Sequence, residues 1–281
     1  MMTRSPRQVA LAAGAALALA GCGDGDPTGP ALEVTLGETS VVVLVNPAVN
    51  SATGVALPTP GSLRSDVSVS WDGGPAVRTD GAGVAVLGPI AAGARSLSLS
   101  GGGLSGSVTA SIAERDLHEI AVALTGSGAA VMADVRYEFG GEVIEVTTAT
   151  PLAQVNELLS RSDVIVLFRG GTYRGDLVFS GSNVTLFGAG IRGGEVVIEG
   201  NVTVEGSRNR IRGARVVGDL TVSGSNAGVA LSRVTGRFSL SGSGGVLLEN
   251  ALCGQVSVTG SNPLLLGNAG LAPLPSPQGG C

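Results

Sequence analysis

In the C-terminal half of the chain, apolar and polar positions recur every 18 residues. Four segments align without gaps, at 200–217, 218–235, 236–253 and 254–271. Each opens with Gly, continues with apolar residues at alternate positions, and then carries a Gly-Ser pair. Four apolar columns result: Val202, Leu220, Phe238 and Val256; Val204, Val222, Leu240 and Val258; Ile211, Val229, Leu247 and Leu265; and Val216, Val234 and Leu252. The fourth column ends there, because Gly270 occupies its next position.

This repeat predicts a parallel β-helix. Its short runs of alternating apolar residues, bounded by Gly, Ser and Asn, are typical of strands and turns. A unit of this length cannot bury a core alone, but stacked copies can, with the like columns about 4.8 Å apart. An earlier copy at 175–183 matches 218–226, and the longer step after it contains Glu195–Glu199, where we predict an extra strand. A left-handed hexapeptide helix would have an apolar residue at every sixth position, but the sixth residue after Val202 is Arg208. We therefore predict a right-handed β-helix.

The segment before the repeats predicts a capping helix followed by strands. Thr150-Pro151 can start a helix, with an apolar face that includes Val155 and Leu159. The strand 164–168, the turn Gly-Thr-Tyr at 171–173 and Asn-Val-Thr-Leu-Phe-Gly at 183–188 follow. This order is similar to the start of pectate-lyase-like right-handed β-helices. The resemblance covers residues 150–271 and implies a fold rather than an activity, because that fold hosts lyases, hydrolases, adhesins and scaffolds.

The pattern of strand and turn signals at residues 31–149 predicts a small β-sandwich with bridging strands. Candidate strands lie at 41–45, 67–71, 83–87, 96–99, 108–112 and 119–124, separated by Gly- and Pro-rich turns. The run at 72–101 resembles the Ig-like or carboxypeptidase-regulatory-like modules of exported bacterial proteins. We therefore expect an all-β protein, with a sandwich followed by a single-stranded β-helix.

The N-terminus predicts export and a lipid anchor. Arg4 and Arg7 precede a short apolar run that ends in Leu-Ala-Gly-Cys22, which resembles the lipobox of bacterial lipoproteins. The resemblance implies that residues 1–21 are a signal peptide, that Cys22 is lipidated, and that residues 22–30 form a tether. Gly23 favours the outer membrane. The alternative is an ordinary cleaved signal.

The remaining cysteines and the net charge further restrict the class of protein. In an oxidising compartment we expect a disulfide between Cys253 and Cys281 that pins the Pro- and Gly-rich tail at 272–281; two separate thiols are the alternative. The net charge is −5, and every basic residue is Arg. An acidic, exported chain is a poor nucleic-acid ligand. We expect a monomer without a cofactor.

Catalytic residues are scarce in the sequence. The one histidine, His118, lies in a charged turn, and we expect it to be a solvated surface residue. With one His, and two Cys left after lipidation of Cys22, the sequence has too few ligands for a zinc site. Between 150 and 271 the aspartates are Asp163, Asp176 and Asp219. Asp176 and Asp219 could form an inverting carboxylate pair, although a coincidence of two turn residues is the simpler interpretation.

One stretch of the β-helix is basic. The arginines at this place form a candidate patch for an anionic ligand: Arg208, Arg210, Arg212, Arg215, Arg233 and Arg237. The alternative is that they pair with Glu195, Glu199 and Glu205.

These patterns favour a non-catalytic envelope protein that is attached to the membrane and presents a β-helix to a polysaccharide or an envelope protein, or acts as a spacer. A polysaccharide lyase or hydrolase is the first alternative. A self-assembling scaffold is the second, and the capped ends of the β-helix argue against it.

Overall fold

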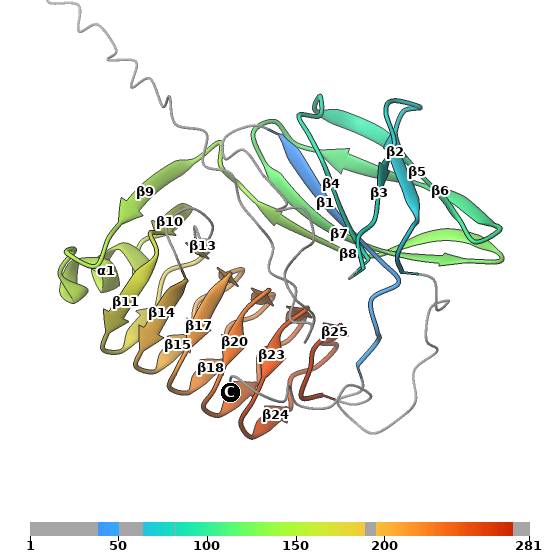
Figure 1. Cartoon of the computed structure of the whole chain (residues 1–281). Coiled ribbons are helices and arrows are strands. Elements are labelled where there is room, and N and C mark those ends of the chain that lie inside the picture. Colours follow the sequence, from blue (N-terminus) through green and yellow to red (C-terminus); the bar gives the residue numbers. More distant parts are fainter. Residues whose placement is uncertain (1–38, 51–63, 82, 189–194, 272–281) are drawn as a thin grey trace, which may run out of the picture.

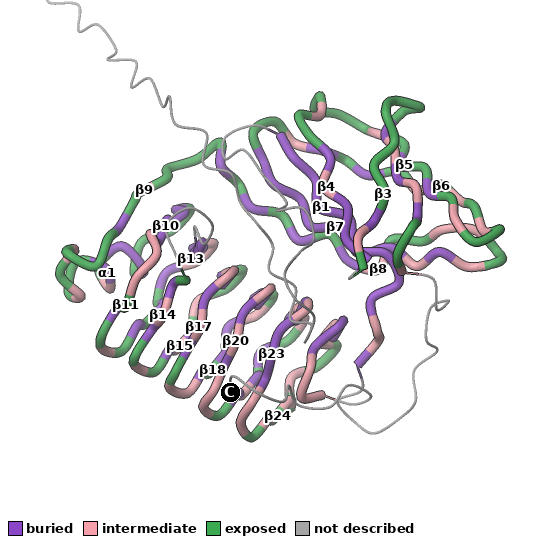
Figure 2. The backbone as a smooth tube through the Cα atoms, in the orientation of Figure 1, coloured by how far each residue is buried: buried purple, intermediate pink, exposed green. Residues whose placement is uncertain are grey.

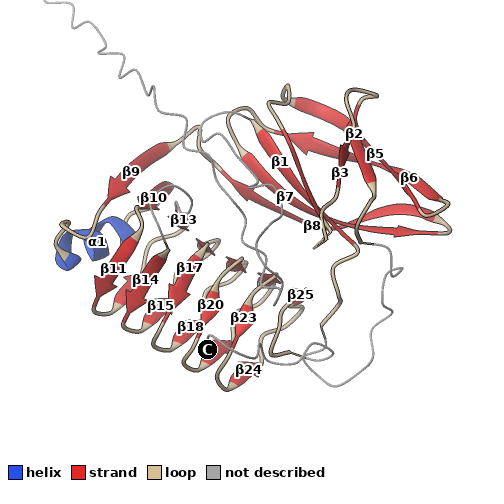
Figure 3. Ribbon diagram, in the orientation of Figure 1, coloured by secondary structure: helices blue, strands red, loops and turns tan. Residues whose placement is uncertain are grey.

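The computed structural model describes residues 39–50, 64–81, 83–188 and 195–271. These residues form an all-β protein with one α-helix, in which a β-sandwich precedes a parallel β-helix (Figures 1 and 3). The predicted fold class is therefore confirmed. The predicted signal peptide and tether, Cys22 and the C-terminal tail lie outside the described residues.

Two four-stranded sheets make up the sandwich. The first, called the shared sheet, has the order β4-β1-β7-β8; the second, called the outer sandwich sheet, has the order β3-β2-β5-β6. The strands are β1 (Ser40–Val45), β2 (Ser68–Trp71), β3 (Val77–Arg78), β4 (Val84–Leu87), β5 (Gly93–Gly101), β6 (Leu104–Ile112), β7 (Leu117–Thr125) and β8 (Gly128–Tyr137). Every predicted strand of the sandwich is present.

The central strands of the shared sheet, β1 and β7, are buried on both of their faces. Val41, Val43 and Val45 face the outer sandwich sheet, and Val42 and Leu44 face the β-helix. All six residues of β1 are buried as a result (Figure 2). A strand covered on both sides has a continuous apolar sequence rather than an alternating one, which explains the run of valines in β1.

The β-helix has three parallel sheets that share each coil. The docked sheet, which contacts the sandwich, has the order β25-β22-β19-β16-β13-β10-β9; the second sheet is β11-β14-β17-β20-β23, and the third sheet is β12-β15-β18-β21-β24. The docked sheet contains β9 (Glu142–Val146), β10 (Val164–Phe168), β13 (Val184–Gly188), β16 (Arg210–Arg212), β19 (Gly228–Ala230), β22 (Val246–Leu248) and β25 (Leu264–Leu266). The second sheet contains β11 (Gly171–Arg174), β14 (Val196–Glu199), β17 (Ala214–Val216), β20 (Arg233–Val234) and β23 (Ala251–Leu252). The third sheet contains β12 (Leu177–Phe179), β15 (Val202–Val204), β18 (Leu220–Val222), β21 (Phe238–Leu240) and β24 (Val256–Val258).

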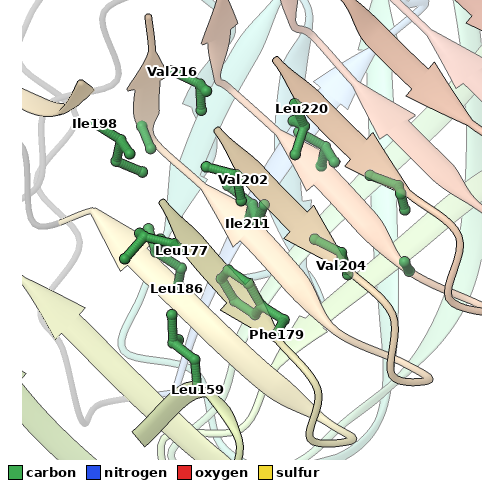
Figure 4. Close-up of a cluster of buried hydrophobic side chains, with 14 of the residues drawn as sticks. Leu159, Leu177, Phe179, Leu186, Ile198, Val202, Val204, Ile211, Val216 and Leu220 are labelled. Atoms are coloured by element: carbon green, nitrogen blue, oxygen red, sulfur yellow. The ribbon is translucent and has the colours of Figure 1, made fainter. Parts of the chain in front are cut away.

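The strand register confirms the apolar columns. Val202 pairs with Leu220, Leu220 with Phe238, and Phe238 with Val256. The other three columns are stacked in the same way, from Ile211 to Leu265, from Val204 to Val258 and from Val216 to Leu252. Their side chains meet inside the coils, as Figure 4 shows for Leu177, Val202 and Leu220.

The strand predicted at Glu195–Glu199 is present as β14, but it is not an additional one. It pairs with β11 in the preceding coil and β17 in the following coil, and so takes the regular second-sheet place in its coil. The additional length of this coil lies before β14, at residues that include 189–194, outside the described structure.

The recurring Gly of the Gly-Ser pair has a steric explanation. A Cβ atom built on Gly224 would lie 2.0 Å from the carbonyl oxygen of Gly206, and one on Gly242 would lie equally close to that of Gly224. Successive coils therefore approach too closely at this corner for any side chain. The left-handed backbone conformation falls instead two residues later, at positions such as Asn226, with φ of 54°.

Both ends of the β-helix carry additional chain. At one end the predicted helix, α1 (Leu152–Leu159), packs against β12 of the third sheet with Val155, Leu158 and Leu159 buried, and β9 pairs with β10 as the edge strand of the docked sheet. At the other end the chain that leaves β1 reaches the last coil, where Gly267 N–H donates to Ala48 O (2.6 Å) and Asn50 N–H donates to Leu265 O (2.9 Å). The N-terminal module thus supplies the cap of the C-terminal coil.

An asparagine ladder extends this cap into the interior of the β-helix. Ser232 N–H donates to Asn250 Oδ1, Asn250 N–H to Asn268 Oδ1, and Asn268 N–H to Asn50 Oδ1 (3.0, 3.1 and 2.6 Å). Each amide side chain thereby satisfies a buried backbone donor in the coil below.

Candidate functional site

The structure distributes the six predicted patch arginines over different surfaces. Arg210 and Arg212 lie on the docked sheet, whereas Arg215 and Arg233 are register partners on the second sheet. Arg208 and Arg237 occupy exposed turn positions. Arg215 also pairs with Glu195, with Nη1 and Oε2 3.6 Å apart, as the alternative interpretation expected.

Arg212 corrects the patch prediction most clearly, because it is a buried residue. Its side chain is 2% exposed and faces the sandwich, where Nε donates to Glu119 Oε1 at 2.7 Å. Glu119, on β7, is fully buried, and its second oxygen accepts a hydrogen bond from Tyr137 Oη at 2.8 Å. This ion pair joins residues 93 positions apart and links the two modules.

Aromatic rings complete the surroundings of this ion pair. The guanidinium of Arg212 lies 4.8 Å from the ring centroid of Phe187 and 5.8 Å from that of Tyr137, both within cation–π range. Burial and the negative charge of Glu119 raise the pKa of Tyr137 well above its usual value, so its hydroxyl remains a donor. Arg212 Nη2 is buried without a hydrogen-bond partner. The arrangement is that of a structural contact between modules rather than an exposed ligand site.

A second ion pair connects the modules near the last coils. Arg64 Nη2 donates to Glu249 Oε1 at 3.0 Å, and the Glu249 side chain is 23% exposed. Glu249 has a left-handed backbone, with φ of 50°, and its carboxylate lies directly over Gly267. Burial raises the pKa of Glu249 to about 7, although the nearby guanidinium of Arg64 acts in the opposite direction. This carboxyl therefore titrates near neutral pH.

Asp176 and Asp219 stabilise turns between coils. Asp176 Oδ1 accepts a hydrogen bond from Asn201 N–H, and Asp219 Oδ1 accepts one from Arg237 N–H, both at 2.7 Å. Between them, Asn201 Oδ1 accepts from Asp219 N–H at 3.0 Å. The three residues form one column of turn positions, and each accepts a hydrogen bond from the backbone of the next coil.

The prediction that His118 is a solvated surface residue is wrong. Its side chain is 1% exposed, and Nδ1 lies 2.9 Å from Asp134 Oδ1. Nε2 lies 3.4 Å from the backbone N–H of Ala113. His118 is on β7, where its neighbours Leu117 and Glu119 face the β-helix, so alternation directs it to the interior of the sandwich. The charged residues beside it in the sequence concealed this burial.

The cysteine predictions remain untested. Cys253 follows β23, but Cys22 and Cys281 lie outside the described residues. Within the described part of the chain, no group of three or more His, Cys, Asp and Glu residues is arranged to hold a metal ion. No helix of this part has the length and apolar character needed to cross a bilayer.

The exposed side of the third sheet carries a regular array of hydroxyl groups, called here the hydroxyl face. Thr203, Thr221, Ser239 and Ser257 are stacked in register on consecutive strands. Two further stacked columns follow toward the Gly-Ser corner. The hydroxyl face consists of Thr203, Ser207, Thr221, Ser223, Ser225, Ser239, Ser241, Ser243, Ser257, Thr259 and Ser261, with Glu205 at one end of the middle column.

The sequence contains the signal for this face. Its members occupy the polar positions that alternate with the apolar columns of the 18-residue repeat. The sequence-based search for charged and aromatic groups overlooked them, because a serine has little chemical specificity when it is considered alone.

Comparisons with known proteins give no assignment. No family model matches the chain, and neither the curated proteins nor the solved structures contain a match to it.

Proposed function

We propose that this protein is a non-catalytic envelope lipoprotein, anchored at the outer membrane through Cys22, that presents its β-helix to a glycan or protein or acts as a spacer. We further propose that the β-helix is right-handed and of the pectate-lyase-like type, and that Cys253 and Cys281 form a disulfide. One observation carries the proposal: the sandwich covers one β-helix sheet through a buried contact and leaves the other two sheets outward (Figure 1).

The contact between the modules suits presentation. Phe187, Ala230, Leu248 and Leu266 on the docked sheet are all buried against the sandwich. Burial of side chains of this size stabilises by about 1.5–3 kcal/mol for each large apolar residue. A sandwich held in this way positions the β-helix as a rigid support at the end of the N-terminal tether.

The environment of the aspartates also supports a non-catalytic function. An inverting hydrolase needs one carboxylic acid and one carboxylate that are free to exchange protons with the substrate and a water. Asp176 and Asp219 instead each accept a hydrogen bond from a backbone N–H of the next coil, so both carboxylates are engaged in holding turns. The helix α1 at one end of the β-helix and the segment 48–50 on the last coil similarly favour a monomer over end-to-end assembly.

Two measurements test the proposal. Metabolic labelling with palmitate should mark the wild-type chain and not Cys22→Ala, and fractionation should place the labelled protein in the outer membrane. The purified chain should bind isolated envelope material and release no sugar ends from acidic polysaccharides. Release of reducing or unsaturated ends that Asp219→Asn abolishes, while melting is unchanged, would establish an enzyme instead.

A further inference from the structure

At the C-terminal end of the β-helix, a segment of the N-terminal module takes the place of a further coil. Residues 48–50 follow β1 and reach the last coil (Figure 1). Gly267 N–H donates to Ala48 O, and Asn268 N–H donates to Asn50 Oδ1, both at 2.6 Å. In the earlier coils the equivalent N–H groups donate to the next coil instead. We call the contact between residues 48–50 and the last coil the joint.

The side chain of Glu249 extends from the preceding coil into the joint. Its position in the repeat is the one that Gly267 holds in the last coil, and both residues have a left-handed backbone, with φ of 50° and 68°. A Cβ atom built on Gly267 would lie 2.1 Å from Glu249 Oε1. The carboxylate therefore fills the space beside the residue that binds Ala48. A long side chain in this backbone region is uncommon, and here it places a titratable group inside a contact between the two modules.

Arg64 is the charged partner of this carboxylate. Its Nη2 donates to Glu249 Oε1 at 3.0 Å, and its Nε is buried without a hydrogen-bond partner. Thr79 Oγ1, directly after β3, donates to Arg64 O at 2.7 Å, so the sandwich holds the arginine in place. The ion pair thus crosses from the sandwich to the β-helix at the joint.

The other elements around the carboxylate add no further charge to it. The last coil at 254–271 and residues 48–50 have no ionisable side chain. The charged residues of the neighbouring segments have other partners or lie elsewhere: Asp66 pairs with Arg78, Asp80 Oδ1 accepts from Val84 N–H, Arg233 lies on the second sheet, and Arg237 lies in the turn that Asp219 binds. The charged form of Glu249 is therefore governed by its burial and by Arg64.

Burial makes the ionised form of this carboxyl costly while the joint is closed. The Glu249 side chain is 23% exposed, and burial raises its pKa from the ordinary 4.5 to about 7, against the opposing effect of Arg64. In an open joint the carboxyl is hydrated and returns toward its ordinary pKa. The closed joint therefore retains a proton that the open joint releases, and opening becomes more favourable as pH rises from 4.5 to about 7.

We propose that Glu249 and Arg64 form a pH-sensitive latch, which keeps the joint closed at acidic pH and lets it open locally when the carboxyl of Glu249 ionises. Both modules stay folded in the open form. Opening releases residues 48–50 and uncovers β25, whose Leu266 forms a bridge with Val49 in the closed form. The inference goes beyond the proposed presenting function and does not depend on it.

Hydrogen–deuterium exchange of the full chain in detergent measures the opening. The backbone N–H groups of Asn50, Gly267 and Asn268 bond across the joint and report its opening, whereas those of β1 and β7 report unfolding of the sandwich. Each exchange rate is divided by the intrinsic rate at that pH. A carboxyl whose pKa changes from 4.5 to about 7 predicts a roughly thirtyfold rise in the opening constant of the joint between about pH 5.5 and 8. The N–H groups of β1 and β7 should exchange far more slowly at both pH values.

Three variants separate the latch from other effects of pH. Glu249→Gln removes the titrating group, and the opening constant should become independent of pH. Arg64→Met removes the compensating positive charge, so the rise with pH should become steeper. Asp66→Asn is the matched control, because it removes an exposed carboxylate close to Arg64 in the sequence at a position with φ of 63°, which Asn adopts readily. This control should keep the pH dependence of the wild type.

Several results would overturn the inference. A rise with pH that persists in Glu249→Gln would assign the effect to another group, and loss of the rise in Asp66→Asn as well would make it a general effect of charge. Equal exchange of the joint and of β1 and β7 at every pH would show that the joint opens only when the protein unfolds. If Glu249→Gln does not fold, Arg64→Met decides, because an unchanged dependence on pH in that variant refutes the latch.

Discussion

The buried pair of Glu119 and Arg212 should be a major determinant of stability. The two side chains are 0% and 2% exposed, and each is the other's charged partner at 2.7 Å. Glu119→Gln leaves the guanidinium without a counter-charge, and Arg212→Met leaves the carboxylate without one. Removing one member of a buried pair typically costs about 3–5 kcal/mol, because an uncompensated charge remains in the interior. We therefore expect each single variant to lose about this much unfolding free energy.

The double variant distinguishes this reasoning from simple loss of packing. Glu119→Gln with Arg212→Met removes both charges and retains an amide that can accept from Tyr137 Oη. Its loss should be well below the sum of the two single losses, because no unpaired charge remains. A coupling energy of about 2 kcal/mol or more is expected.

The assay is urea unfolding followed by two probes. Trp71, the one tryptophan of the chain, is 8% exposed in the sandwich core, so its fluorescence reports that module. Circular dichroism reports both modules. If the network couples them, the two transitions coincide in the wild type. In the single variants both transitions move to lower urea, because both modules contribute to the buried network.

The exposed pair of Arg78 and Asp66 is the control. Its side chains are 71% and 80% exposed, so Arg78→Met should leave the transition where it is. The reasoning is refuted if Arg212→Met costs no more than the control, or if the losses of the two single variants simply add in the double variant.

Further predictions concern the coils and the second ion pair. Val222→Asp places a charge inside the β-helix and should cost several kcal/mol in thermal or urea unfolding, whereas Thr221→Asp on the exposed side should not; equal melting of the two would contradict the column register. Gly224→Ala should cost about 1–3 kcal/mol or more because of the carbonyl 2.0 Å from its Cβ, while Gly126→Ala, which meets no atom within 4 Å, should be tolerated. Because the pKa of Glu249 is raised to about 7, the folded protein binds a proton more tightly than the unfolded chain. Unfolding free energy should therefore fall by up to about 3 kcal/mol as pH rises from about 4.5 to 7. Urea titrations at several pH values should show this dependence in the wild type and lack it in Glu249→Gln.

The placement of His118 and Arg212 shows the limit of reading charged residues along a chain. Both were assigned to the surface, because His118 stands among acidic residues and Arg212 stands among arginines. Both are buried, because the shared sheet packs against the outer sandwich sheet on one face and the β-helix on the other. A residue that would be solvated on an isolated module becomes internal when a second module covers it.

The repeating part of this protein could be predicted from its sequence. An 18-residue spacing of apolar positions is a local property, and stacking is the one way for such short units to bury them, so the columns, the coils and the capping helix were readable in advance. The outward positions Ala230, Leu248 and Leu266 recur at the same spacing, but they were not recognised as an apolar set, because the preceding member of their column is Arg212. What covers them depends on the packing of the two modules. Three features depend on contacts between distant segments. The sandwich packs on the docked sheet, Arg212 pairs with Glu119, and Asn50 joins the asparagine ladder through Asn268, 218 residues away. Such contacts carry no period in the sequence, because each is made once.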